Sequence, residues 1–181
     1  MGIVDFFKKA SELKYLKRTG WIISGVKNPE SVGDHTFMVS LMAYIYALKL
    51  GTDAEKVLKM SIIHDICEAY SGDIPNRKGV SSEEKLKKEK EGFERIVSSL
   101  PYDIRLEMTE IWNEFLEQKT KEAQLVRDVD KLDMCLQALK YSKIYGKEKF
   151  MEFFKDCEKS IKTEMVRKDF EKIKNEFESS V

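Results

Sequence analysis

The sequence lacks any apolar run long enough to cross a membrane, and it lacks an excess of charge of either sign. Its longest apolar stretch, residues 37–48, is shorter than the roughly 20 residues that a membrane-spanning helix needs, and Lys49 follows it directly. Lysines and arginines number 32, and aspartates and glutamates also number 32. No overall electric field therefore favours a nucleic-acid polymer or a membrane surface as the partner.

Cysteine is also scarce. The three cysteines, Cys67, Cys135 and Cys157, show no CxxC spacing, and their odd number rules out complete disulfide pairing within one chain. No signal peptide is recognisable, so we expect reduced thiols in a cytoplasmic protein. Cys67 and Cys135 lie in apolar surroundings and are expected to be small core residues rather than nucleophiles.

Strand patterns of alternating apolar residues are absent, whereas helical spacing recurs along the chain. Helices are expected over residues 3–15, 31–50, 52–70, 81–100, 101–116 and 121–145, with one or two more from 147 onward. Residues 16–29 read as an irregular link, and the charged run at 83–91 reads as a solvated face or a mobile lid. We predict one all-α domain over residues 1–181, with about seven to nine helices, a core over about 6–145, and C-terminal helices at 147–178 packed on it.

Several helix ends are marked by capping residues. Ser31 or Asp34 can cap the helix that follows, and Gly51 ends it. The sequence TDAE at 52–55 predicts a capping box for the next helix, which is expected to carry His64 and Asp65. SSEE at 81–84 predicts another.

Histidine is the rarest of the residues that could do chemistry, with only two in the chain. His64 stands beside Asp65 in SIIHDICEAYSGDIP, the most apolar part of the sequence. Burying an unpaired carboxylate there would cost at least roughly several kcal/mol unless a cation or hydrogen bonds compensate it. A divalent metal is the simplest compensating cation.

His35 opens a second apolar segment, and two crossing helices would let both imidazoles reach one ion. Asp65 would be the third ligand, and the fourth would be one acid of LVRDVDKLDMCLQAL, in which Asp128, Asp130 and Asp133 compete. Two imidazoles and two carboxylates suit Mn²⁺, Co²⁺, Fe²⁺, Ni²⁺ or Zn²⁺ better than Ca²⁺. On an ion that prefers six ligands, they leave positions for water and a substrate oxygen, as in a catalytic site.

Four segments taken together carry a resemblance. RTGW at 18–21, PESVGDH at 29–35, HDICEAYSGDIP at 64–75 and DVDKLDMCLQA at 128–138 occur in this order between about residues 6 and 145. They resemble the HD-domain metal-dependent phosphohydrolases, in particular the 5'-deoxynucleotidase branch with HD-domain-containing protein 2 and the YfbR-like enzymes. The resemblance chooses Asp130 as the fourth ligand. It implies hydrolysis of deoxyribonucleoside 5'-monophosphates with a divalent metal (Mn, Co, Fe, Ni, Zn or Mg) in a homodimer.

The resemblance also implies roles for individual residues. Glu68 would act on the attacking water as general base or through a second metal, and Asp73 would share in catalysis. Asp73 and Ile74 would help to hold that second cation, and with Asn76 they would contact sugar and phosphate. Arg18 would bind the phosphate, and Trp21 would pack against the sugar so that a 2'-hydroxyl is excluded. In the YfbR-like members the Arg and Trp are adjacent, whereas two residues separate them here.

Each of these proposed roles has a simpler structural alternative. Arg18 could be solvated and Trp21 could cover a core edge, while Glu68 and Asp73 could simply end a buried helix. The chain could be a different small-nucleotide phosphohydrolase or phosphodiesterase of the HD superfamily. It could also be a non-catalytic, metal-stabilised helical module that binds a nucleotide or a protein.

Overall fold

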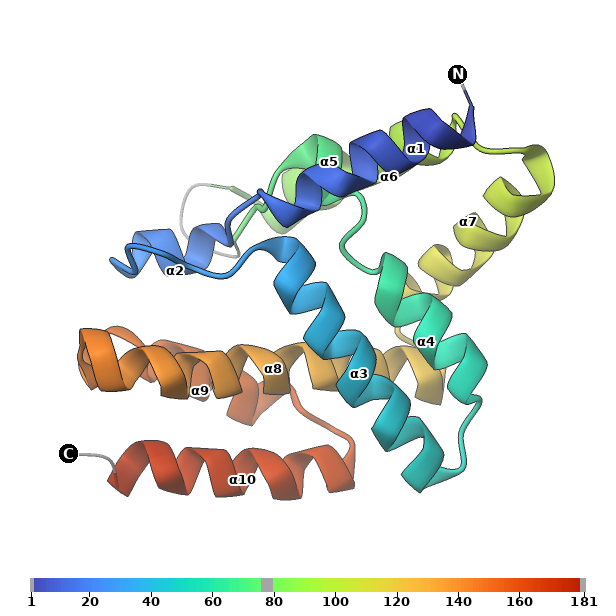
Figure 1. Cartoon of the computed structure of the whole chain (residues 1–181). Coiled ribbons are helices and arrows are strands. Elements are labelled where there is room, and N and C mark those ends of the chain that lie inside the picture. The colour runs from blue at the N-terminus through green and yellow to red at the C-terminus, as the bar shows by residue number, and fades with distance from the viewer. Residues whose placement is uncertain (1, 76–79, 180–181) are drawn as a thin grey trace.

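The computed structural model describes residues 2–75 and 80–179, and this part of the chain is helical without a strand (Figure 1). Its only β-type pairing is a bridge between Lys17 and Ser31. The elements are α1 (Ile3–Ala10), η1 (Ser11–Lys14, a 3₁₀ turn), α2 (Thr19–Ile23), α3 (Val32–Leu50), α4 (Ala54–Ile63), α5 (Glu68–Ser71), α6 (Ser82–Val97), α7 (Tyr102–Glu117), α8 (Lys121–Tyr145), η2 (Lys147–Lys149, also 3₁₀), α9 (Met151–Ser160) and α10 (Glu164–Ser179).

The all-α prediction is confirmed. Helices α2 and α5 have only five and four residues, which leaves eight longer helices in the described part, within the expected range. The longest, α8, begins and ends at the residues that the sequence predicts. None of the described helices is long and apolar enough to cross a membrane.

Helix α8 is the centre of the arrangement. It contacts α3, α4, α7, α9 and α10, and Figure 1 shows α3 crossing it while α9 and α10 run beside it. One apolar cluster forms along this helix and takes in the buried faces of α3, α9 and α10. A second cluster gathers residues of α1, α5, α6 and α7. The protein therefore has two apolar cores, with α3 and α4 contributing to both.

The two cores meet at the first histidine. Val32 belongs to the second cluster and Val39 to the first, and His35 stands between them on the same side of α3. In the same way, Met60 of α4 packs in the first cluster and Ile63 in the second, immediately before His64. Both imidazoles thus lie at the seam between two apolar clusters.

Helix α3 is delimited as expected. Ser31 accepts a hydrogen bond from the backbone N–H of Asp34, whose carboxylate accepts one from the Ser31 N–H in return. Gly51 ends the helix at φ +64°, a left-handed conformation that glycine adopts without a steric penalty. The predicted box at Ser81–Glu84 is confirmed too.

Two expectations about α4 are wrong. Its N-cap is Asp53, which accepts from the Lys56 N–H, so Thr52 does not form the predicted box. The helix also ends at Ile63 and does not carry His64 or Asp65. The Ser61 carbonyl, which would accept the next helical hydrogen bond, is instead 2.6 Å from His64 Nδ1. A side chain thus takes the place of a backbone donor, and the chain continues in tighter turns.

One further expectation also needs correction. The link at 16–29 contains the short helix α2, so it is only partly irregular. The aromatic rings of the C-terminal segment, at Phe150, Phe154, Phe170 and Phe177, are buried within this chain. They pack against one another and against α8, so they do not form an exposed apolar face.

Gly92 of α6 marks the closest approach between α6 and α5. A Cβ at this position would lie 2.6 Å from the Cys67 carbonyl oxygen, a backbone atom that cannot swing away. We expect Gly92→Ala to lower the free energy of unfolding by about 1–3 kcal/mol, because the helices must separate. Thermal unfolding followed by circular dichroism measures this, at about 2–4 °C per kcal/mol.

Gly20→Ala is the matched control. A Cβ there meets only Phe153 Cε1 at 3.9 Å, an ordinary contact, so the melting temperature is expected to stay or rise slightly. An unchanged melting temperature in Gly92→Ala would show that α6 does not depend on this approach.

Candidate metal centre and nucleotide cavity

His35 is completely buried, and both ring nitrogens face carboxylates. Nδ1 lies 2.8 Å from Asp133 Oδ2, and Nε2 lies 3.2 Å from Asp130 Oδ1. Burial lowers the pKa of His35, but the two neighbouring aspartates outweigh it and raise the pKa to about 9. The two acids thus stabilise a positive charge at this ring, whether it is a proton or a metal ion.

His64 is oriented by the backbone. Its Nδ1 lies 2.6 Å from the Ser61 carbonyl oxygen, which accepts a hydrogen bond only if Nδ1 carries the proton. The lone pair is then on Nε2, which is buried and makes no hydrogen bond within the described residues. His35 Nε2 is also buried and also makes no hydrogen bond within the described residues. Two buried, unsatisfied ring nitrogens in a polar cluster are what a metal ion would satisfy.

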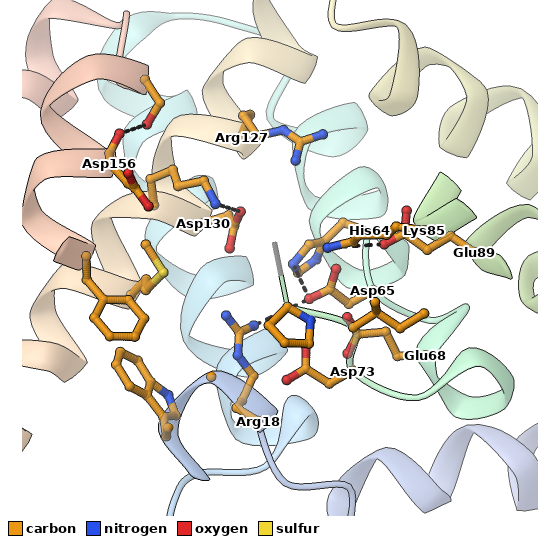
Figure 2. Close-up of a pocket in the computed structure, with 18 of the residues that line it drawn as sticks. Arg18, His64, Asp65, Glu68, Asp73, Lys85, Glu89, Arg127, Asp130 and Asp156 are labelled. Carbon is orange, nitrogen blue, oxygen red and sulfur yellow. Dashed lines mark hydrogen bonds and ion pairs between the residues drawn. The ribbon is translucent and has the colours of Figure 1, made fainter. Parts of the chain in front are cut away.

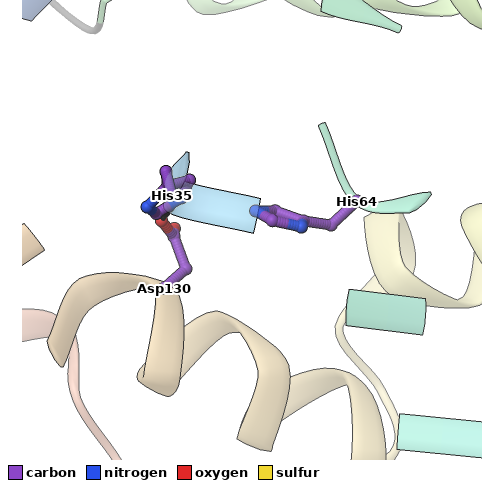
Figure 3. A group of neighbouring side chains, drawn as sticks. All are labelled: His35, His64 and Asp130. Atoms are coloured by element: carbon purple, nitrogen blue, oxygen red, sulfur yellow. Dashed lines mark ion pairs between the residues drawn. The ribbon is translucent and has the colours of Figure 1, made fainter. Parts of the chain in front are cut away.

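The four expected ligands lie together. One nitrogen of each ring and one oxygen of Asp130 lie within 4.8 Å of one another (Figure 3). Asp65 Oδ2 lies 3.2 Å from His64 Nε2 and 3.7 Å from His35 Nε2. Neighbouring positive groups lower the pKa of Asp65 despite its burial, so its carboxylate is ionised. The donor set fits a divalent transition-metal ion.

The structure separates the three acids that competed on α8. Asp128 points away from the cluster and accepts from the backbone N–H groups of Lys162 and Thr163, at the start of α10. Asp133 holds His35 through its far nitrogen. Of the three, only Asp130 groups with both histidines, whereas Asp133 pairs with the other nitrogen of His35 and forms a second group of ligand-type atoms with Glu30.

Glu68 and Asp73 follow the turn that carries His64 and Asp65, and both line the same cavity. Glu68 is buried, and its Oε2 has no hydrogen-bond partner within the described residues. Burial and the charges of Asp65 and Asp73 raise the pKa of Glu68 well above its usual value. Asp73 accepts a hydrogen bond from the Thr19 N–H at the start of α2, so this acid also positions the segment that carries Arg18.

The expected substrate residues are found in different settings. Arg18 lies beside the proposed metal ligands, with Nη1 3.6 Å from Asp65 Oδ2. Burial lowers the pKa of Arg18, but the surrounding carboxylates outweigh this and raise it. Trp21 lines the cavity, but its side chain is only 1% exposed and donates to Glu30. Ile74 lines the cavity as well, whereas Asn76 falls outside the described residues.

The cluster opens into a cavity of about 1420 Å³ (Figure 2). Its walls come from α2, the turn after α4, α6, α7, α8 and α9. Charged wall residues that the sequence did not single out are Lys85, Glu89, Arg127, Lys131, Lys149, Glu152, Asp156 and Lys159. Arg127 was detectable in principle, since it lies three residues before Asp130 on a predicted helix and therefore on the same side. The expectation of a solvated face at residues 83–91 does not hold for Lys85 and Glu89, which line the cavity. The mobile lid stays a prediction.

The family model described as HD domain matches residues 10–174. The chain is 37% identical over 162 residues to the 5'-deoxynucleotidase HDDC2 of Dictyostelium discoideum, covering 83% of this chain and 85% of the relative. It is 33% identical over 171 residues to a 5'-deoxynucleotidase of Schizosaccharomyces pombe, covering 92% and 86%.

Among solved structures, a conserved hypothetical protein from Pyrococcus furiosus is 34% identical, with a TM-score of 0.77 over 95% of this chain and 99% of that one. Two imidazoles and two carboxylates that lie together in a polar cavity are the donor set of a divalent-metal site. The chain belongs to the HD domain family.

The geometry predicts different losses for two neighbouring acids. We expect Asp130→Asn to abolish stoichiometric metal binding, because it removes a carboxylate that faces both Nε2 atoms. Asp133→Asn should weaken binding by about 10–100-fold, since it only releases the His35 ring. Metal content by mass spectrometry and Mn²⁺ titration calorimetry measure both. Loss of metal in Asp133→Asn with full retention in Asp130→Asn would reverse the assignment.

Proposed function

We propose that the protein is a metal-dependent 5'-deoxynucleotidase, which hydrolyses deoxyribonucleoside 5'-monophosphates to a deoxynucleoside and phosphate. The observation that carries this is the convergence of His35, His64, Asp65 and Asp130 beside Arg18 in one polar cavity. The curated relatives of similar length that are named 5'-deoxynucleotidases support the same reaction.

A divalent ion bound by these four ligands would supply Lewis-acid charge that stabilises the transferring phosphoryl group. Arg18 binds a phosphate oxygen, since its guanidinium is ionised and lies at the edge of the ligand cluster. Glu68 accepts the proton of the attacking water. Its buried, unpartnered Oε2 in the cavity wall supports this role.

We assign the remaining cavity residues as follows. Asp73 positions Arg18 through α2 and takes part in catalysis beside Glu68. Glu68, Asp73 and Ile74 are the candidates to hold a second cation, and Ile74 with Asn76 is the candidate segment for sugar and phosphate contacts. Trp21 is the proposed wall against the 2'-position. Its almost complete burial means that it acts through the indole edge and through Phe153, whose ring centroid lies 4.6 Å away.

A panel of paired deoxy- and ribonucleoside monophosphates, with and without chelator, tests the reaction. We expect chelator-sensitive phosphate release that is faster for the deoxy member of each pair. Glu68→Gln should lower kcat by at least about 100-fold with the metal still bound, because the proton acceptor is lost. A non-catalytic module would show no release in either protein. Preferred hydrolysis of a cyclic or diester substrate would favour the phosphodiesterase alternative.

We further propose a single functional unit over residues 1–181, located in the cytoplasm. The family match over residues 10–174 and the packing of α9 and α10 on α8 support the first point. The three buried cysteines without a disulfide support a reducing compartment.

We propose that the protein is a homodimer that uses the outer face of α3. Phe37, Leu41, Tyr44, Ile45 and Leu48 lie on this face at helical spacing and are between 40% and 67% exposed. Analytical ultracentrifugation should give a dimer for the natural chain and a monomer for Leu41→Lys/Ile45→Glu. Tyr102→Lys, on an exposed apolar residue of α7, is the control that should remain dimeric. A monomeric natural chain would contradict the proposal.

A further inference from the structure

Arg127 is a cavity residue that the proposed reaction does not yet use. It lies on α8, three residues before Asp130, and its Cζ is 4.7 Å from the ring centroid of Phe115. The same ring makes an edge-to-face contact with His64, with centroids 5.8 Å apart. Phe115 thus holds the Arg127 guanidinium in place beside His64, one of the proposed metal ligands.

Within the described residues Arg127 interacts electrostatically with Glu89, but not at the distance of an ion pair. The other cations near the cluster have carboxylate partners within 3.6 Å, namely Arg18 with Asp65, Lys131 with Asp130 and Lys85 with Glu89. Within residues 2–75 and 80–179, no carboxylate forms an ion pair with Arg127. Its contact with Phe115 supports the guanidinium plane and leaves its N–H donors available.

The position of this charge is costly unless an anion accompanies it. A half-buried guanidinium beside a cluster that fits a divalent cation meets repulsion when the cation binds. An anion between the two positive groups converts this repulsion into attraction. Figure 2 shows Arg127 and Arg18 on opposite sides of the His64–Asp65 pair, both directed into the cavity.

We propose that Arg127 is the second arm of a phosphate clamp and selects a dianionic phosphomonoester over a monoanionic diester. The inference rests on the proposed function and adds the charge of the substrate that the site prefers. Arg18 and Arg127 each bind non-bridging oxygens of one phosphate group. A diester has one negative charge fewer and an esterified oxygen in place of an acceptor, so it gains less from the second guanidinium.

The test compares Arg127→Met and Arg127→Lys with the natural protein. Arg105→Met on α7 is the control, because Arg105 also lies over an aromatic ring, that of Tyr102, but does not line the cavity. Inorganic phosphate is the probe, through its inhibition constant and through titration calorimetry of the metal-loaded protein. We expect Arg127→Met to weaken phosphate binding and raise KM for deoxyribonucleoside monophosphates by about tenfold or more, the loss typical of a charge-assisted hydrogen bond. Bound metal should be unchanged, Arg127→Lys should recover part of the loss, and Arg105→Met should behave as the natural protein.

Hydrolysis of a diester probe, bis(4-nitrophenyl) phosphate, should change less than threefold in Arg127→Met. Unchanged phosphate binding in this variant would overturn the clamp, as would an equal loss on monoester and diester. Loss of bound metal would also overturn it, since Arg127 would then support the ligands. Should the Met variant unfold, Arg127→Gln, which is shorter but keeps a polar, uncharged end, decides by the same measurements.

The clamp and the proposed function fail in different ways. Turnover of monophosphates that does not depend on Arg127 removes the clamp and leaves the nucleotidase. Phosphate binding that depends on Arg127 in a protein without monophosphatase activity removes the nucleotidase and leaves an anion site.

Discussion

The hydrogen bond between His35 Nδ1 and Asp133 is the interaction on which the site depends. It joins α3 to α8 in the interior, and it fixes which nitrogen of the ring is directed at Asp130. The ring itself is completely buried, so water cannot take over this role if the carboxylate is lost. Because His64 is fixed by a backbone carbonyl, both imidazoles are oriented before any cation arrives, which lowers the ordering cost of binding.

The seam between the two apolar clusters explains why a polar site can exist inside so small a protein. Val32 and Val39 anchor α3 in different clusters, and the residue between them is enclosed without belonging to either. On the other side of the seam, Gly92 lets α6 approach the Cys67 carbonyl, directly before Glu68. Packing of this kind holds the acids of the cavity wall at fixed positions, although the local chain is only a turn and a four-residue helix.

Much of this architecture could be predicted from the sequence because it depends on local rules. The rarity of histidine, the burial of the His64–Asp65 pair and the capping residues of α3 are visible without coordinates. Local rules did not choose Asp130, since three acids on one helix differ only in direction and the neighbours decide which direction faces the ligands; only the resemblance of the motif pointed to it. The early end of α4 also escaped prediction, because it depends on one side chain that competes for a backbone carbonyl. Charged residues such as Lys85 and Arg127 look the same in a sequence whether they face solvent or a cavity built by other helices.

The three aspartates of α8 have one more consequence. Asp128 holds the start of α10, Asp130 faces the imidazoles and Asp133 orients His35, so three tasks are distributed around a single helix. Successive residues of a helix are rotated by about 100°, so one inserted or deleted residue within this stretch would turn every following side chain away from its task. Point substitutions here remove one function each, whereas a change of length would remove them together.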